Sequence, residues 1–286
     1  MRMKITKQQL LPFLLLLPST VYFLIFFAFP FTQGLWLAFT TRDGEFTLGN
    51  FQELLTYSKF YTTVINTLSL VIIVVPLQLG LGLIIALLVN TRLFGTSKFL
   101  YICAIPIAIS EIAAGIIWYS IFTSRGYLNS LLYWFGLIKE PITFLSYETP
   151  QNLFTALVVC EVWRATAIVM VILVAGLQMI HKDFLDAAEV FGATKLQKLK
   201  YVILPMLKPS IQTALIIRTV LAFQMFSPVL VLTGRRIPVL ASEAYYVQFT
   251  LRDFNMASTY GIFMMALSTF FVVLYLKLLR TKWVMV

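Results

Sequence analysis

Six long apolar stretches constrain the fold of this chain more than any other feature of its sequence. A helix needs about 20 mostly apolar residues to cross a bilayer. The six stretches run roughly over Leu10–Phe39, Val64–Asn90, Phe99–Thr123, Leu153–Leu177, Ile211–Leu232 and Met256–Leu279. Only 12% of the 286 residues are charged, against ~25% in soluble domains. We therefore expect an all-α membrane protein with six transmembrane helices in one domain over residues 1–286, and neither a soluble nor a disordered chain.

The residue inventory excludes several chemistries. One histidine, His181, and two cysteines in apolar surroundings, Cys103 and Cys160, leave no His-rich or CxxC metal site and no disulfide framework. None of the 13 glycines is followed by lysine, so the chain has no Walker A loop. We expect no catalytic residue, no metal and no cofactor in this chain.

The first stretch could be mistaken for a cleaved signal peptide, because Met1–Gln9 looks like a basic leader region. Its apolar run continues too far, and no small-residue cleavage site follows. We therefore expect a retained anchor that is kinked or ends near Pro30.

The positive charges predict the orientation of the chain. With six spans, one face receives both termini and the segments Thr91–Lys98 and Gln178–Ser210. That face carries thirteen Lys and Arg against three acids, whereas the opposite face carries seven of each sign. The net charge of +10 therefore lies on one side of the membrane. By the positive-inside rule both termini are cytoplasmic, and the charge is not a nucleic-acid footprint.

The longest inner segment, Gln178–Ser210, is patterned. Its first part predicts a helix over Lys182–Phe191, which Asp183 is able to cap. Gly192 is expected to end this helix, because glycine adopts a positive φ at little energetic cost. A second short helix is predicted over Thr194–Val202, stopped by Pro205 and Pro209 before the next span. The first helix has one apolar stripe, formed by Phe184, Ala187, Ala188 and Phe191. The stripe alone fits equally a docking element for a partner protein and an interfacial helix on the bilayer.

A family resemblance separates these two interpretations. The stretch DAAEVFGATKLQKLKYVILPMLKP, from Asp186 to Pro209, resembles the signature loop of ABC importer permeases. Matching positions are held by Ala187, Ala188, Gly192, Ile203, Leu204 and Pro205. The opening LLLPSTVYFLIFFAFPF and the segment Gly126–Leu137 resemble the first-permease type of binding-protein-dependent sugar importers, of the maltose or glycerol-3-phosphate kind. Departures are Asp186 for the usual Glu, Phe191 where Asp is common, and Leu232–Arg236 in place of a frequent T-x-GGP turn.

The resemblance implies a type I ABC importer permease fold with a helix–Gly–helix coupling loop. It also implies a cell-membrane transport subunit that is not itself an enzyme. Its partners would be two ATPase subunits that bind ATP and magnesium, a second homologous permease and an external solute-binding protein. The coupling residues implied are Phe184, Asp186, Ala187, Ala188, Phe191, Gly192, Leu204 and Pro205. The substrate implied is a sugar or a related polyol.

Four charges fall inside the predicted spans, where each costs about 2.5–3.5 kcal/mol on insertion scales. Glu111 is predicted near mid-depth of the third span, and Arg164 shares a helix face with Glu161 in the fourth. Arg218 lies nearer the inner end of the fifth span, where it could snorkel. These groups either line a pathway or join helices as paired charges, and Glu161 with Arg164 fits the paired interpretation better.

Gln224 lies near the centre of the fifth predicted span between Phe223 and Phe226. An amide beside aromatic rings suits a sugar, so the candidate pathway residues are Glu111, Glu161, Arg164, Phe223, Gln224 and Phe226. Prolines 76, 106 and 228 could kink spans around a cavity.

Three alternatives stay open on the residues alone. The first is a proton-coupled secondary transporter that uses Glu111 or Glu161. The second is an ABC importer permease for a solute other than a sugar. The third is a membrane scaffold whose inner loop only recruits a cytoplasmic protein.

Overall fold

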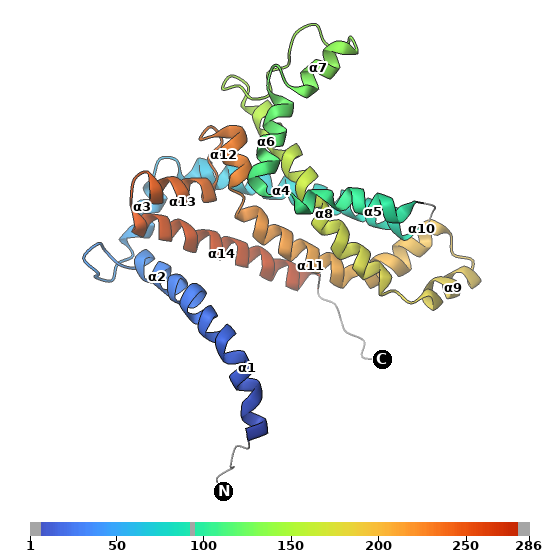
Figure 1. The fold of residues 1–286 in the computed structure, drawn as a ribbon, viewed down its shortest axis with the longest axis horizontal. Helices are drawn as coiled ribbons and strands as arrows, with labels where there is room; N and C mark the ends of the chain where they lie inside the picture. The colour runs from blue at the N-terminus through green and yellow to red at the C-terminus, as the bar shows by residue number, and fades with distance from the viewer. Residues whose placement is uncertain (1–6, 92–94, 280–286) are drawn as a thin grey trace. The chain divides into compact units, whose positions relative to one another are not determined.

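The computed structural model describes residues 7–91 and 95–279 as a helical chain (Figure 1). Two compact units divide it, one formed by residues 1–58 with 244–263 and the other by residues 59–243 with 264–286. Parts of three predicted inner segments, residues 1–6, 92–94 and 280–286, lie outside the described residues. The predicted candidate sites all fall in the second unit.

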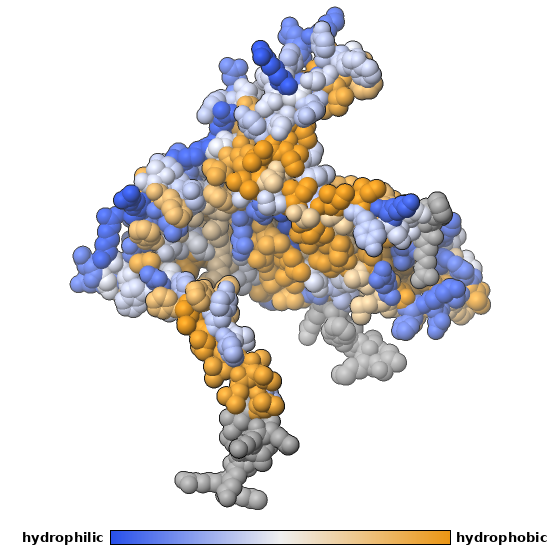
Figure 2. All heavy atoms as spheres, viewed as in Figure 1, coloured by the Kyte–Doolittle hydropathy of each residue, from blue (hydrophilic) through white to orange (hydrophobic). Residues whose placement is uncertain are grey.

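The described α-helices are α1 (Lys7–Phe23), α2 (Phe29–Ala38), α3 (Gly49–Thr56), α4 (Phe60–Asn90), α5 (Thr96–Ala104), α6 (Glu111–Phe122), α7 (Tyr127–Trp134), α8 (Pro150–Gln178), α9 (Lys182–Val190), α10 (Lys195–Lys198), α11 (Leu204–Phe223), α12 (Ser227–Thr233), α13 (Leu240–Phe249) and α14 (Phe254–Leu278). By length and composition five helical segments are able to cross a membrane, and six if the bent pair 96–108 and 111–134 counts as one span. Figure 2 shows broad orange surfaces along the helices, as expected where side chains meet lipid rather than water.

The first predicted span does not end near Pro30. A π-helical turn, Leu24–Ala28, joins α1 to α2, and the helix continues to Ala38. A proline ring clashes with the carbonyl four residues earlier in a regular α-helix. Here that carbonyl belongs to Phe26, inside the wider π turn, so the helix bypasses the proline instead of stopping.

The same arrangement corrects the prediction that Pro205 and Pro209 separate the inner loop from the fifth span. α10 continues through a second π turn, Leu199–Ile203, directly into α11. The carbonyl four residues before Pro205 is that of Tyr201, again inside a π turn. The segment Lys195–Phe223 is therefore one long candidate span that begins within the inner loop.

The core of the second unit is built from α4, α8 and α11. Val169, Met170 and Leu173 of α8 are buried with Ala86 of α4 and Leu207 of α11. Glycines permit the close approach. A Cβ on Gly82 would lie 2.7 Å from Cγ1 of Val169, and one on Gly176 would lie 2.1 Å from Oγ of Ser210.

The third and fifth predicted stretches are broken in the structure. Pro106 lies in a 3-10 turn, Ile105–Ala108, just before the break in the third stretch. The helical segments before and after the break, Thr96–Ala108 and Glu111–Trp134, are bent by 102°. The fifth stretch ends as α11 at Phe223 and resumes as α12 after Phe226, with Pro228 in its first turn. Glu111 is consequently the first residue of a helix rather than a mid-helix residue, and Ser110 caps that helix through the amide of Ala113.

Gly80 and Gly82 of α4 provide a matched test of this packing. We expect Gly82→Ala to lower the free energy of unfolding by about 1–3 kcal/mol, because its Cβ would overlap Val169. No atom lies within 4 Å of a Cβ at Gly80, so Gly80→Ala is expected to be neutral or slightly stabilising through helix propensity. Thermal unfolding of both variants in detergent measures the difference, and equal midpoints would contradict the close α4–α8 contact.

Candidate functional site

The inner loop forms two short helices around a glycine corner. α9 ends at Val190, and Gly192 has φ +75°, which confirms the predicted use of glycine at this turn. The side chains around the corner are turned to the surface. Phe184 is 51% exposed, Val190 86% and Phe191 90%. The corner is therefore an apolar tip with no cover from the described residues, and Val190 adds to it although the sequence pattern did not single it out.

The residue that caps α9 differs from the prediction. The cap at the start of α10 was not predicted from the sequence. His181, not Asp183, occupies the cap position, because Asp183 already lies in the first helical turn. There its negative charge still favours the helix dipole. The second helix starts with a reciprocal capping box. The amide of Gln197 donates to Oγ1 of Thr194 at 3.3 Å, and the amide of Thr194 donates to Oε1 of Gln197 at 2.8 Å. The T-x-x-Q spacing in the sequence signals this box.

One ion pair spans the glycine corner. Lys198 of α10 donates to Oε1 of Glu189 of α9, and the hydrogen bond together with the lysine charge lowers the pKa of the Glu189 carboxyl from its usual value. A second contact places Nζ of Lys182 3.9 Å from Oδ2 of Asp186. The first pair therefore connects the two helices across the corner.

The remaining loop residues differ in exposure. Ala187 is exposed, while Ala188 is half-buried on the side of the helix turned to the rest of the unit. Leu204 is half-buried and Pro205 exposed at the start of α11. The exposed surface around α9 and α10 is mostly hydrophilic in Figure 2, so the apolar tip stands out within a polar end.

The second candidate site is a network of buried charges centred on Glu161. The carboxylate of Glu161 is 1% exposed, and its Oε1 accepts from Nη2 of Arg164 at 2.9 Å and from Nη2 of Arg218 at 3.0 Å. Arg164 also contacts Oε1 of Glu111 at 3.0 Å. Two arginines and two glutamates thus sum to zero charge and link α6, α8 and α11.

Gln78 of α4 completes the network. Its Oε1 accepts from Nε of Arg218 at 2.8 Å, and its Nε2 donates to the backbone carbonyl of Glu161 at 2.9 Å. Sequence reasoning missed Gln78, because no local signal connects it to partners 83 and 140 residues away. A polar residue inside an apolar run is the sequence signal that could have drawn attention to it, because a buried polar group needs a partner.

The structure corrects the predicted snorkelling of Arg218. This side chain is 1% exposed and points to Glu161 and Gln78 instead of the membrane surface. A buried carboxylate and an amide oxygen satisfy the guanidinium better than the long reach to the headgroups. Its Nη1 group is buried with no hydrogen-bond partner in the described part of the chain.

The candidate pathway residues Phe223, Gln224 and Phe226 do not line a common space. Phe223 is 1% exposed and packs with Val71, Val75 and Phe271. Gln224 ends α11 and is exposed, and Phe226 is half-buried in the break before α12. Among the candidate pathway residues, the structure brings together Glu111, Glu161 and Arg164, and it leaves the Phe223–Phe226 segment outside that group. Glu111 is the accessible edge of the charge network, with its side chain 40% exposed.

Comparisons with known proteins all find membrane components of transport systems. A family model described as a binding-protein-dependent transport system inner membrane component matches residues 45–283. The trehalose/maltose transport system permease protein MalF of Thermococcus litoralis is 32% identical, over 96% of this chain and 96% of its own. The trehalose transport system permease protein SugA of Mycobacterium tuberculosis is 33% identical, over 79% of this chain and 74% of its own. A chain in the crystal structure of a bacterial alginate ABC transporter, in complex with an alginate pentasaccharide-bound periplasmic protein, shares the fold with a TM-score of 0.84 at 22% identity, over 96% and 95% of the two chains.

The pair of Glu189 and Lys198 is expected to make the inner loop sensitive to acid. The pKa of Glu189 is lowered in the folded loop, so the pair stabilises it above the ordinary carboxyl range and is lost as the pH falls through the lowered pKa. Amide exchange of residues 182–198 should therefore rise over that acidic interval, and Glu189→Gln should remove the rise. Asp186→Asn is the control, since the 3.9 Å contact of Asp186 is within α9 and does not cross the corner. An unchanged exchange profile in Glu189→Gln would contradict the assignment.

The charge network gives a second matched pair of variants. Glu161→Gln leaves the buried Arg218 and the half-buried Arg164 without their shared carboxylate, so we expect it to lower the free energy of unfolding by about 3–5 kcal/mol. Glu111→Gln should cost much less, because Glu111 is 40% exposed and Arg164 keeps Glu161. Denaturant unfolding of the purified protein compares the two, and the assignment is wrong if Glu111→Gln is the more damaging substitution.

Proposed function

This chain belongs to the family of binding-protein-dependent transport system inner membrane components, and we propose that it forms half of the translocation pathway of an ATP-driven importer for a sugar or a related polyol. The observation that carries the proposal is the family match over residues 45–283, which includes the entire inner loop with its exposed tip. The chain is a transport subunit, and ATP hydrolysis falls to separate ATPase subunits that bind ATP and magnesium.

The names of the relatives support a sugar as substrate. Two permeases about one third identical to this chain are named for trehalose or for trehalose and maltose. The alginate transporter with the same fold is described in complex with a periplasmic protein loaded with a pentasaccharide. Trehalose and maltose are therefore the first solutes to test, and an importer for a different solute is the alternative.

The inner loop is proposed as the coupling element. In this proposal each of the two permeases presents its loop to one ATPase subunit, and the second, homologous permease completes the pathway. Phe184, Val190 and Phe191 supply an apolar tip for a cleft in that subunit, and burial of such side chains gives most of the affinity at interfaces. Gly192 sets the corner, and the pair Glu189–Lys198 keeps the two helices as one stiff unit. Asp186, Ala187 and Ala188 shape the helix, and Leu204 with Pro205 begins the span that the loop moves.

The orientation follows from charge. The face that carries the inner loop has thirteen Lys and Arg against three acids, which the positive-inside rule assigns to the cytoplasm. Both termini are then cytoplasmic in the cell membrane, and the external binding protein meets the segments 40–63, 124–152 and 233–255. The loop and the solute-delivery side thus lie on opposite faces of the membrane, as import requires.

The proton-coupled alternative receives less support from the geometry. A proton carrier must release its carboxylate from fixed partners and present it to water on each side in turn. Glu161 is buried and held by two arginines, and Glu111 is held by Arg164. The network suits a structural joint between helices better than a carrier. The scaffold alternative also receives less support, because the family that matches residues 45–283 is described as a component of a transport system.

Phe191→Ser tests the coupling role. We expect it to weaken retention of the ATPase subunits by about tenfold or more, because a 90% exposed aromatic ring at the tip is the main apolar contact offered to them. Sugar-stimulated ATP hydrolysis by the assembled complex in lipid nanodiscs should fall with it. Phe135→Ser, at a 64% exposed ring on the opposite face, is the matched control and should change neither. Full ATPase stimulation in Phe191→Ser, or uptake by this chain alone under a proton gradient, would overturn the proposal.

A further inference from the structure

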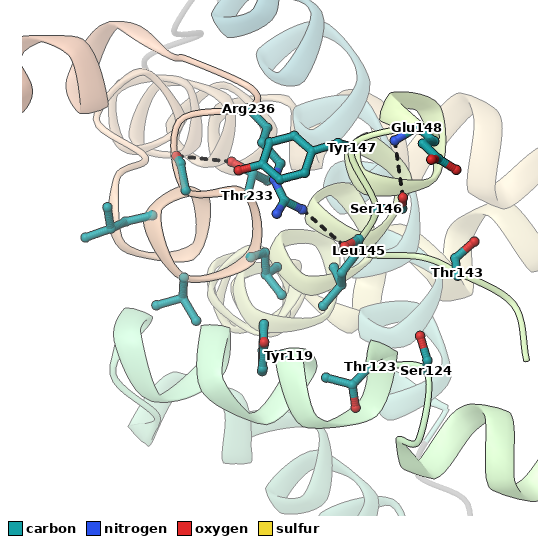
Figure 3. Close-up of a pocket in the computed structure, with 14 residues that line it drawn as sticks. Tyr119, Thr123, Ser124, Thr143, Leu145, Ser146, Tyr147, Glu148, Thr233 and Arg236 are labelled. Atoms are coloured by element: carbon teal, nitrogen blue, oxygen red, sulfur yellow. Dashed lines mark hydrogen bonds between the residues drawn. The ribbon is translucent and has the colours of Figure 1, made fainter.

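A cavity of about 690 Å³ (Figure 3) lies beside the ends of α6 and α12, which Figure 1 shows apart from α9 and α10 of the inner loop. It is bounded by the last turn of α6, the connection 143–148 before α8, and the last turn of α12. Its volume falls within the roughly 300–1,000 Å³ range of small-molecule sites. We name it the Tyr147 cavity. In the proposed orientation it faces the outside of the cell.

The walls of the Tyr147 cavity combine aromatic rings with hydroxyl groups. Tyr119 and Tyr147 contribute the rings, with exposures of 47% and 75%. Hydroxyl groups of threonine and serine are distributed around them, and Glu148 adds a carboxylate. The hydroxyl residues are Thr123, Ser124, Thr143, Ser146 and Thr233. Figure 3 shows that these groups come from three separate segments and surround one space.

Arg236 holds one wall in place. Its guanidinium carbon lies 3.2 Å from the centroid of the Tyr147 ring, and Nη1 donates to the carbonyl of Leu145 at 3.1 Å. The guanidinium thus covers one face of the ring, and the high exposure of Tyr147 leaves other ring surface open. Arg236 therefore supports the ring of Tyr147 through its planar face and joins it to the Leu145 carbonyl through one N–H group.

The turn that carries Arg236 is itself anchored. Gly234 has φ +58°, a conformation that side chains rarely adopt, and the preceding Thr233 is buried with its hydroxyl donating to Val229. Arg235 binds the 1% exposed carboxylate of Glu243 at 2.8 Å. Arg235 and Arg236 therefore tie this turn to Glu243 and to the connection 143–148.

From this geometry we propose that the Tyr147 cavity binds a sugar ring at the outer mouth of the permease. A pyranose ring presents C–H faces that pack on aromatic rings and hydroxyls that both donate and accept, and the walls supply both kinds of partner. The inference rests on the proposed sugar-import function and adds a location and a residue set to it.

Photolabelling tests the location directly. The complete importer in nanodiscs is exposed to trehalose or maltose that carries a diazirine, irradiated and digested for mass spectrometry. We expect labels within residues 143–148 and 230–236 that are competed by the unmodified sugar. Labels confined to other segments, or labels in the cavity that the free sugar does not displace, overturn the proposal. Crosslinking of the cavity to a loop of the binding protein with no sugar label would assign it to protein docking and also overturn it.

Variants separate ring stacking from folding. Tyr147→Ala should reduce competed labelling by about tenfold, and Tyr147→Phe should retain most of it because the ring remains. Tyr127→Ala removes a 72% exposed tyrosine of α7 that does not line the cavity and should behave as wild type. Equal labelling of Tyr147→Ala and wild type overturns the assignment of Tyr147.

Uptake measured in parallel distinguishes this inference from the proposed function. ATP-dependent uptake of radiolabelled sugar by the wild-type importer, in the presence of the loaded binding protein, tests the function alone. If the wild-type importer takes up the sugar but the cavity is not labelled, only the cavity assignment fails. If the wild-type importer shows neither uptake nor labelling with either sugar, the sugar-import function and the inference fail together.

Discussion

The buried carboxylate of Glu161 is the interaction on which the second unit depends. A charge at this depth is tolerated only if it is paired and hydrogen-bonded, and Glu161 receives two guanidinium groups within 3.0 Å. Arg164 lies on the same helix, α8, and reaches α6 through Glu111, while Arg218 comes from α11. Gln78 adds α4 through Arg218 and the Glu161 carbonyl. Directional hydrogen bonds and ion pairs therefore constrain the relative positions of α4, α6, α8 and α11. Apolar packing alone would let these helices slide past one another.

This constraint supports the coupling role proposed for the inner loop. The loop lies between α8 and α11, and these two helices are joined by Glu161 and Arg218 and by the close approach of Gly176 to Ser210. The second helix of the loop continues through a π turn into α11 without a break. In the coupling role proposed above, a displacement of the tip would reach a helix pair joined by these contacts and would move that pair as a rigid body.

The sequence predicted what depends on local or periodic signals. The apolar stretches, the glycine corner at Gly192 and the pairing of Glu161 with Arg164 can all be read within a few residues of chain. The partner of Arg218 and the helix continuation past Pro30 and Pro205 could not be predicted in this way. The first depends on a residue far along the chain, and the second on a π turn whose wider backbone accommodates the proline ring. The break between Ala108 and Glu111 lies beside Pro106, where the sequence indicated a kink but not its size.

The same reasoning explains why the Leu232–Arg236 turn can depart from its family's frequent pattern without damage to the frame. Arg235 and Arg236 find their partners in Glu243, Leu145 and Tyr147, none of which belongs to the buried charge network. The network is electrically neutral without them, so changes of charge in this turn leave its balance untouched. A change of charge in this turn therefore acts on the cavity end of the unit and not on the contacts that join α6, α8 and α11.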